Sequence, residues 1–87
     1  MAYAIIVKPS AKRELSRLPR EVQRRIAERI DELARSPRPP GAETYRGRQH
    51  SYRTRVGDYR IVYEVDDSRA EVWVFLIGHR KDVYRRQ

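Results

Sequence analysis

The sequence contains no cysteine and no apolar run long enough to span a membrane. The absence of cysteine excludes disulfide bonds and cysteine-based metal sites, so a chain of 87 residues has to rely on one modest hydrophobic core. The N-terminus also lacks the basic segment and apolar stretch of a signal peptide. We therefore expect a single domain over residues 1–87 that is soluble and cytoplasmic and has no membrane partner.

Lysine is scarce, although the chain is strongly basic. Twenty basic residues oppose twelve acidic ones for a net charge of +8, and only the residues at positions 8, 12 and 81 are lysine. Arginine carries a planar fork of donors that holds phosphate or carboxylate in a bidentate manner and stacks on nucleobases. A genome rich in arginine codons explains the bias equally well, so charge alone indicates an acidic partner, either nucleic acid or protein.

Several signatures of catalytic and binding sites are missing as well. The chain has no serine–histidine–aspartate order, no glycine-rich phosphate loop and no metal-binding cluster of histidine and carboxylate residues. We therefore expect no metal and no other cofactor. Glu64 and Glu71 are isolated acids near the ends of expected strands, and they do not support a carboxylate mechanism.

The order of the remaining patterns predicts an α+β fold with the elements β-α-α-β-β-β, in which two N-terminal helices pack on a small, mainly antiparallel sheet. A β-branched run over residues 2–7 predicts the first strand, and Ser10 is the expected N-cap of a short helix. Pro19 ends that helix and begins a second one of about four turns. Its apolar stripe consists of Val22, Ile26, Ile30 and Leu33.

The second half of the chain predicts three strands. The proline-rich segment 36–41 ends the second helix, and residues 43–50 are expected to be irregular. Residues 70–77 are almost wholly apolar, as expected of a central strand covered on both faces, and we expect Trp73 and Phe75 in the core.

Residues 51–65 carry the strongest local signal, because Gly57 and Asp58 join two β-prone runs. A type II′ turn with Gly57 first places Arg55 opposite Arg60, on the same face as Arg53. Like charges in opposed positions cost stability, and a bound polyanion would remove that cost. The hairpin therefore indicates a protein that handles phosphate. Three tyrosines alternate onto the other face and are expected to pack against the helices: Tyr52, Tyr59 and Tyr63.

Further candidate residues lie on either side of the hairpin. Arg46 and Arg48 enlarge the positive surface, for which a simple solvated face is the alternative. His50 and His79 could serve as acid and base in RNA cleavage or be plain exposed side chains, and His79 is the better candidate because it adjoins a basic tail. Tyr84 lies in that tail, where neighbouring cations lower the pKa of a phenol and suit it to accept a proton. The alternative is a tyrosine that anchors the last turn to the core.

Three blocks of the sequence resemble the RelE/ParE superfamily of toxins from bacterial toxin–antitoxin pairs. They are the start Tyr3-x-Ile5-x-Val7 with Ala11-x-x-Glu14-Leu15-x-x-Leu18-Pro19, the hairpin residues 52–63, and the ending Gly78-His79-Arg80-Lys81-Asp82-Val83-Tyr84. The similarity covers essentially the whole chain and implies a compact fold like that of microbial ribonucleases. In the RelE branch it also implies cleavage of messenger RNA in the ribosomal A site.

The resemblance implies a catalytic site in which a ribose 2′-hydroxyl attacks the adjacent phosphate and leaves a 2′,3′-cyclic phosphate. Tyr84 would take the hydroxyl proton, and Arg60 and Arg80 would stabilise the developing charge without a metal. Arginine is always protonated and is a poor proton donor, so the general acid stays open between Arg80, His79 and water. The residues expected to hold the RNA backbone are Arg53, Arg55, Arg46, Arg48 and Lys81.

The superfamily also implies partners. A RelB-like antitoxin, acidic in its toxin-binding segment, would lie along the helices or across the arginine face, and the pair would bind promoter DNA through the antitoxin. The ribosome and messenger RNA are the other expected partners. The alternative is a ParE-like toxin that inhibits DNA gyrase by binding and lacks nuclease residues. Arginines on both hairpin strands, together with Tyr84, favour the nuclease.

Overall fold

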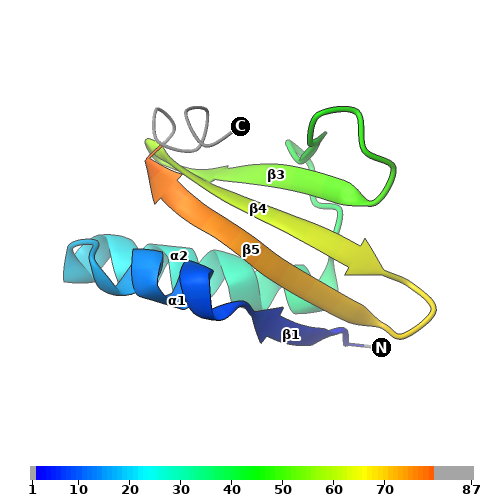
Figure 1. Cartoon of the computed structure of the whole chain (residues 1–87), viewed down its shortest axis with the longest axis horizontal. Helices are drawn as coiled ribbons and strands as arrows, with labels where there is room; N and C mark the ends of the chain where they lie inside the picture. The colour runs from blue at the N-terminus through cyan, green and yellow to red at the C-terminus, as the bar shows by residue number, and fades with distance from the viewer. Residues whose placement is uncertain (1, 80–87) are drawn as a thin grey trace.

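The computed structural model describes residues 2–79, which form a five-stranded sheet of order β1-β5-β4-β3-β2 covered by two helices (Figure 1). β1 runs parallel to β5, and every other neighbouring pair of strands is antiparallel. The expected α+β class, with two helices on a mainly antiparallel sheet, is confirmed. In chain order the elements are β1 (Ala4–Val7), α1 (Pro9–Ser16), α2 (Arg20–Arg35), β2 (Glu43–Thr44), β3 (Ser51–Val56), β4 (Tyr59–Asp66) and β5 (Glu71–His79).

Two local predictions were wrong. The segment expected to be irregular contains β2, whose two residues pair with Tyr52 and Arg53 and extend the sheet by one short strand. The first helix begins at Pro9, with Lys8 at the N-cap, so Ser10 lies inside the first turn instead of capping it. The fixed φ of proline suits the first helical position, where its missing N–H costs nothing.

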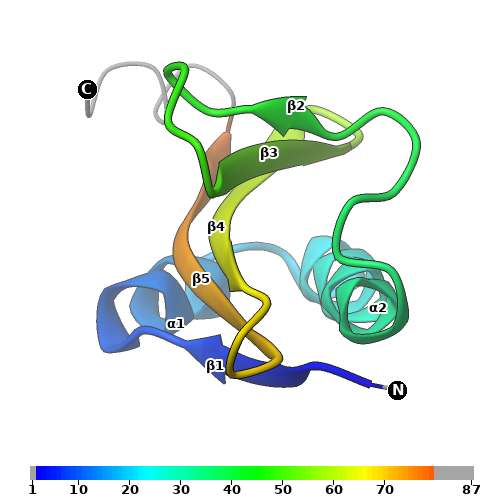
Figure 2. The same ribbon diagram turned by 90° about the vertical axis from the view of Figure 1, so that its right-hand side faces the viewer.

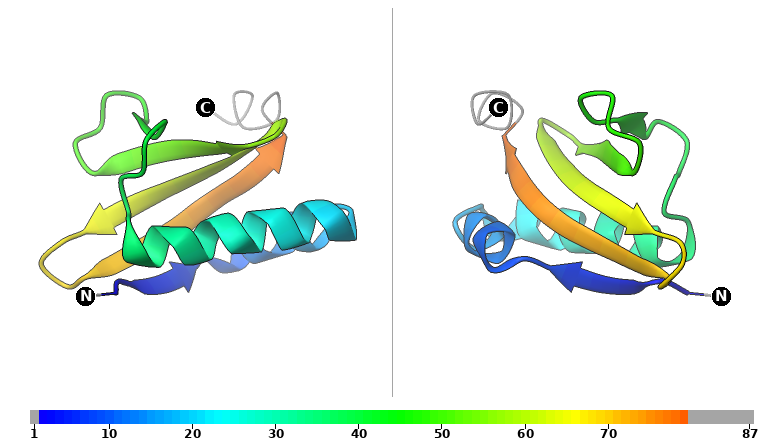
Figure 3. Two further views of the ribbon diagram at one scale, coloured as in Figure 1. Left: turned by 180° about the vertical axis from the view of Figure 1, so that it is seen from behind. Right: turned by 45° about the vertical axis from the view of Figure 1, so that its right-hand side comes forward.

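The main core lies between α2 and the sheet. Ile26 and Leu33 are fully buried, and they belong to one cluster with Ile61, Tyr63 and Ile77 of the strands. Figure 2 shows α1 and α2 next to the β1–β5 part of the sheet, with β2 and β3 at the other end. Figure 3 shows α2 from behind, running along that part of the sheet. Within residues 2–79 no helix is long and apolar enough to cross a membrane.

β5 lies in the interior of the sheet, between β1 and β4, but its two faces differ. Val72 and Val74 are fully buried in the main core. Trp73 and Phe75, which were expected in the core, are only half-buried. The buried residues of both helices pack against the other face of β5, which carries Val72 and Val74. Phe75 instead packs against Tyr45 in a smaller cluster with Val62.

Arg38 anchors the proline-rich connection that follows α2. Its guanidinium pairs with Asp67 in the β4–β5 turn at 2.7 Å and donates to the hydroxyl of Tyr52 at 2.9 Å. The hydroxyl of Tyr3 donates to the same carboxylate at 2.6 Å. The Arg38 hydrogen bond, followed by the Tyr3 hydrogen bond, lowers the pKa of the Asp67 carboxyl. This carboxylate therefore joins the N-terminus, the connection and the β4–β5 turn.

The substitution Asp67→Asn is expected to make the free energy of unfolding less dependent on pH in the acid range. Because the folded-state pKa of Asp67 is lowered, its contribution is present above the unfolded value of about 4 and is lost as the pH falls through the folded value. Urea unfolding between about pH 6 and pH 3 should show a smaller loss of stability for the variant than for the wild type. Asp31→Asn, on the exposed side of α2, is the control. Parallel profiles for Asp67→Asn and the wild type would contradict the expectation.

Candidate phosphate-binding face

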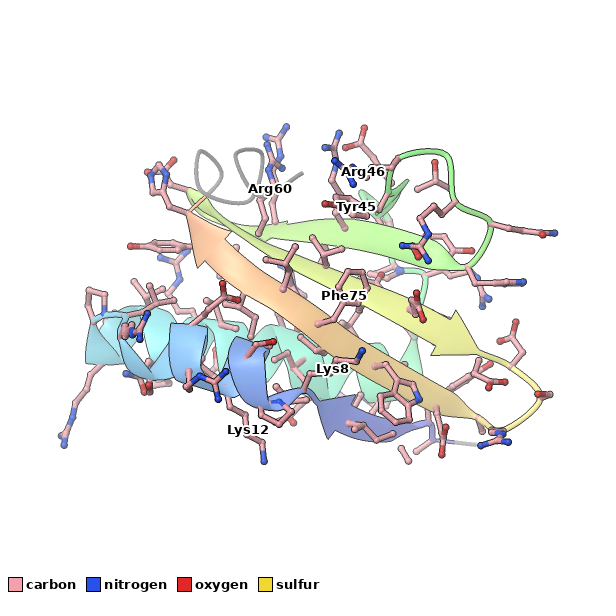
Figure 4. The ribbon with its side chains drawn as sticks, in the orientation of Figure 1. Lys8, Lys12, Tyr45, Arg46, Arg60 and Phe75 are labelled. Carbon is pink, nitrogen blue, oxygen red and sulfur yellow. The ribbon has the colours of Figure 1, made fainter. Side chains whose placement is uncertain are left out.

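The β3–β4 hairpin has the expected register and turn. Arg55 opposes Arg60, and Arg53 opposes Val62. Gly57 has a φ of +59°, a value that favours glycine, while Asp58 stays outside the left-handed region, as a type II′ turn requires. The three arginines therefore stand on one face of the sheet, and Figure 4 shows Arg60 projecting away from the helices. The three tyrosines of the hairpin pack into the main core on the other face, as expected.

The arginines of this face differ in their surroundings. Arg60 is only 5% exposed, whereas Arg55, at the end of the hairpin, is exposed. The side chain of Arg53 is 26% exposed and pairs with Glu43 of β2, with 3.3 Å between Nη2 and Oε1. A guanidinium keeps its charge when buried, and its field is stronger where water is excluded. Of the three hairpin arginines, Arg60 is therefore the one whose charge is least screened by water.

Arg46 and Arg48 reach the face from the loop between β2 and β3. The backbone of Arg46 has a φ of +56°, and its guanidinium lies 5.6 Å from the centre of the Tyr45 ring. Figure 4 shows Arg46 and Arg60 projecting to the same side of the sheet. Arg48 points toward β4, where it pairs with Glu64 at 3.5 Å. Arg46 thus extends the arginine face, while Arg48 lies at its border.

Charge on this face changes sign along β4. Alternate residues share a face, so Arg60, Val62, Glu64 and Asp66 follow one another from the hairpin turn to the β4–β5 turn. An open hollow of about 760 Å³ lies at the acidic end, with Glu64 and Asp66 in its lining. The arginines of the hairpin and the acids of β4 therefore lie at opposite ends of this face.

The two histidines lie apart from the three arginines of the hairpin. His50 lines the acidic hollow, and its carbonyl accepts from the N–H of Val65 at 3.0 Å. His79 opposes Tyr59 in the register, and the two rings meet edge to face at 5.6 Å. Opposed residues share a face, so the imidazole of His79 lies on the tyrosine side of the sheet. His79 therefore does not share the face of Arg60, and His50 lies beside the hollow at the opposite end of β4 from Arg60.

Comparison with known proteins agrees with this architecture. The family model described as "ParE toxin of type II toxin-antitoxin system, parDE" matches residues 5–84. Toxin RelG of Mycobacterium tuberculosis is 31% identical over 87 residues, which cover 99% of this chain and 100% of RelG. This chain belongs to the RelE/ParE superfamily of type II toxins.

Solved structures of RelE proteins share the fold of this toxin. A mutant of the Escherichia coli toxin RelE in the free state is 28% identical, with a TM-score of 0.82 over 98% of this chain and 93% of that one. A chain of the M. tuberculosis toxin–antitoxin complex RelBE2 is 26% identical, with a TM-score of 0.81 over 92% of this chain and 93% of that one.

Three of the expected site residues of this toxin, Arg80, Lys81 and Tyr84, lie outside the described residues. The structure does show where that segment begins. Gly78 of β5 opposes Arg60 of β4, and the hairpin turn and the end of β5 lie at the same end of the molecule (Figure 1). The chain therefore enters the tail from a position beside the arginine face.

Sequence reasoning missed the acids that border the arginine face. Glu43 belongs to β2, a strand of two residues whose pairing with β3 brings its carboxylate to Arg53. Glu64 was treated as an isolated acid, yet it pairs with Arg48. The alternation along β4 placed Glu64 on the same face as Arg60, and that signal was available before the structure. No such signal marked Glu43.

The substitution Glu43→Gln is expected to tighten the binding of single-stranded RNA by about two- to five-fold, the value of one exposed ion pair. The carboxylate of Glu43 pairs with Arg53, so it would compete with a phosphate that approaches this guanidinium, and its removal would end the competition. Fluorescence anisotropy at several salt concentrations should also give a salt slope steeper by about 0.7, as for one added phosphate contact.

The control is Glu21→Gln, which changes the net charge equally but removes one of the two acidic partners of Arg24 on α2. If both variants bind RNA with the same affinity, the effect comes from net charge, and Glu43 has no special part in it.

Proposed function

We propose that this toxin is a ribosome-dependent endoribonuclease that cleaves messenger RNA without a metal. The observation that carries the proposal is the pairing of the buried Arg60 with Arg55 directly across the hairpin. Opposed like charges lower the stability of a sheet, and a phosphate bound between them would offset that loss. The likeness to RelE structures supports the nuclease branch of the superfamily.

In the proposed reaction, the ribose 2′-oxygen forms a bond to the adjacent phosphorus, and the bond from that phosphorus to the 5′-oxygen of the next nucleotide breaks. The products are a 2′,3′-cyclic phosphate and a 5′-hydroxyl. Tyr84 takes the proton of the 2′-hydroxyl, and the leaving oxygen receives a proton from water or Arg80. Arg60 and Arg80 stabilise the charge on the phosphoryl oxygens.

Binding of the RNA backbone is assigned to the surrounding cations. Arg53 and Arg55 stand on the same face as Arg60, and Arg46 projects to the same side. Arg48 and Lys81 complete the proposed set, with Arg48 at the border beside Glu64. His79 receives no role, because its ring packs against Tyr59 on the other face. Arginine is a poor acid or base, so the ribosome supplies much of the rate by holding the messenger in a reactive geometry.

We also propose a cognate RelB-like antitoxin as the partner that controls this activity in the cytoplasm. The RelBE2 structure is that of a toxin–antitoxin complex. An acidic antitoxin segment would be attracted to the arginine face, where it would exclude RNA. Binding of the pair to promoter DNA is assigned to the antitoxin. A gyrase-binding function has less support, because the solved structures described above are those of RelE proteins.

The proposed function predicts cleavage of a messenger held in programmed ribosomes, with a 2′,3′-cyclic phosphate at the new end. Arg60→Ala is expected to reduce the single-turnover rate by about 10²–10³-fold, the usual loss when one charge-stabilising group is removed. The double variant Arg80→Ala, Tyr84→Ala should lose at least as much activity. Arg35→Ala, at the far end of α2, is the control. Primer extension and end-group analysis provide the measurement.

Growth experiments separate this function from gyrase inhibition. A double variant of Arg80 and Tyr84 that still arrests growth, leaves messenger intact and causes DNA breaks would overturn the nuclease function. Loss of growth arrest together with loss of messenger cleavage is the expected result.

A further inference from the structure

Both edge strands of the described sheet stop before they reach the hairpin end. β1 pairs with β5 only from Glu71 to Val74, and β2 pairs with β3 only at Tyr52 and Arg53. Beyond these points, the outer backbone edges of β5 and β3 have no neighbouring strand in the part of the chain that the structure describes. Buried backbone N–H and C=O groups at such an edge need other partners.

α1 supplies a partner at the edge of β5. The N–H of Lys8 donates to the carbonyl of Val74 at 2.9 Å, and the chain then turns into the helix. Six residues further along, the Oε1 atom of Glu14 accepts a hydrogen bond from the N–H of Ile77 at 3.1 Å. Ile77 is fully buried, so without Glu14 this N–H would lose an acceptor in a place that water does not reach.

α2 supplies a partner at the edge of β3. The Nη1 atom of Arg29 donates to the carbonyl oxygen of Arg55 at 2.8 Å and to the hydroxyl of the buried Thr54 at 3.0 Å. Glu32, one turn further on, pairs with the Nε atom of Arg29 at 3.0 Å and orients the guanidinium. Arg25, one turn before, covers the hairpin turn, because a Cβ atom at Gly57 would lie 3.6 Å from its Nη2 atom.

The hydrogen bonds of Arg29 and Glu14 hold the two strands that flank β4, which are β3 and β5. In the sheet register, Arg60 lies between Arg55 of β3 and Gly78 of β5. Arg29 bonds the backbone of Arg55 itself, and Glu14 bonds Ile77, the residue before Gly78. A shift of β3 would move the guanidinium of Arg55, and a shift of β5 would move the point from which the tail begins.

We propose that Glu14 and Arg29 are positioning residues. From the two helices they fix where β3 and β5 lie relative to β4, and so they set the distances between the groups of the proposed phosphate site. The proposal rests on the nuclease function proposed above. Neither residue touches the RNA; each acts through the backbone of a strand that carries or adjoins a site residue. They join segments 63 and 26 residues apart in the sequence. Arg24, in contrast, pairs with Glu21 and Glu28 on its own helix and, among residues 2–79, with no other acid, so it provides a matched comparison.

The first test compares variants in a single-turnover cleavage assay with programmed ribosomes. Glu14→Ala and Arg29→Met are expected to lower kcat by about ten- to hundred-fold, because small misplacements of reacting groups have effects of this size. KM should change less than about two-fold, since the cations that bind RNA remain. Arg24→Met, with the same change on the same helix, should behave as the wild type. Glu14→Gln keeps an acceptor oxygen for Ile77 and should restore most of the rate.

The second test measures amide hydrogen exchange by NMR on the same proteins without RNA. Glu14→Ala should speed exchange at Ile77, and Arg29→Met should speed exchange in the hairpin, each by about five-fold, the value of one hydrogen bond. Arg24→Met should leave both unchanged. Should Arg29→Met fail to fold, Arg29→Lys keeps one donor for the Arg55 carbonyl, and an intermediate loss of kcat is expected.

The two tests distinguish the proposals. A wild-type protein that cuts no messenger overturns the nuclease function, whatever the exchange rates are. If the wild type cuts and both variants keep kcat within about two-fold, the positioning role is overturned. Equal losses in Arg24→Met and Arg29→Met overturn it as well, as does a change confined to KM. Faster exchange together with a loss of kcat that Glu14→Gln relieves supports it.

Discussion

The pairing register of β3 with β4 is the constraint on which the rest of the structure depends. A slip of one residue would exchange the two faces of a strand, so the arginines would enter the core and the tyrosines would leave it. Tyr63 opposes a slip most strongly, because it is fully buried and its hydroxyl donates to the carbonyl of Pro37 at 2.8 Å. Burial raises the pKa of Tyr63 to about 12, so the phenol remains a donor even well above neutral pH. The tyrosine face thus stabilises a register that the arginine face by itself would disfavour.

The acids around the arginine face limit its attraction for polyanions without cancelling it. Glu43 and Glu64 are well exposed, and exposed ion pairs are weak enough for phosphate to displace them. Arg60 is different because it is buried, so its field reaches a bound phosphate with little screening by water. A phosphate bound in the proposed site would therefore interact more strongly with Arg60 than one that merely lies on the surface.

Features that depend on neighbouring residues were predicted correctly from the sequence, whereas features that depend on contacts between distant segments were missed. The register of the hairpin depended on Gly57 and Asp58, a local turn signal, and it was predicted correctly. β2 was missed because two residues have no periodicity of their own and become a strand only through pairing with β3. His79 was linked to the site by its neighbour in the chain, but the pleat turns its ring toward Tyr59. The apolar character of Trp73 and Phe75 did not reveal that the helices cover only one face of β5.

The short edge strands also have a consequence for access to the site. An exposed strand edge is a template for unwanted pairing, and a full-length edge strand would remove that hazard. Here single side chains of α1 and α2 take the backbone groups instead, and within residues 2–79 the hairpin end of the sheet consists of β3, β4 and β5. A narrow end is easier to place in a deep, crowded site than the edge of a complete five-stranded sheet. The contacts of Glu14 and Arg29 therefore complete the hydrogen bonding of the sheet without a further strand among the described residues.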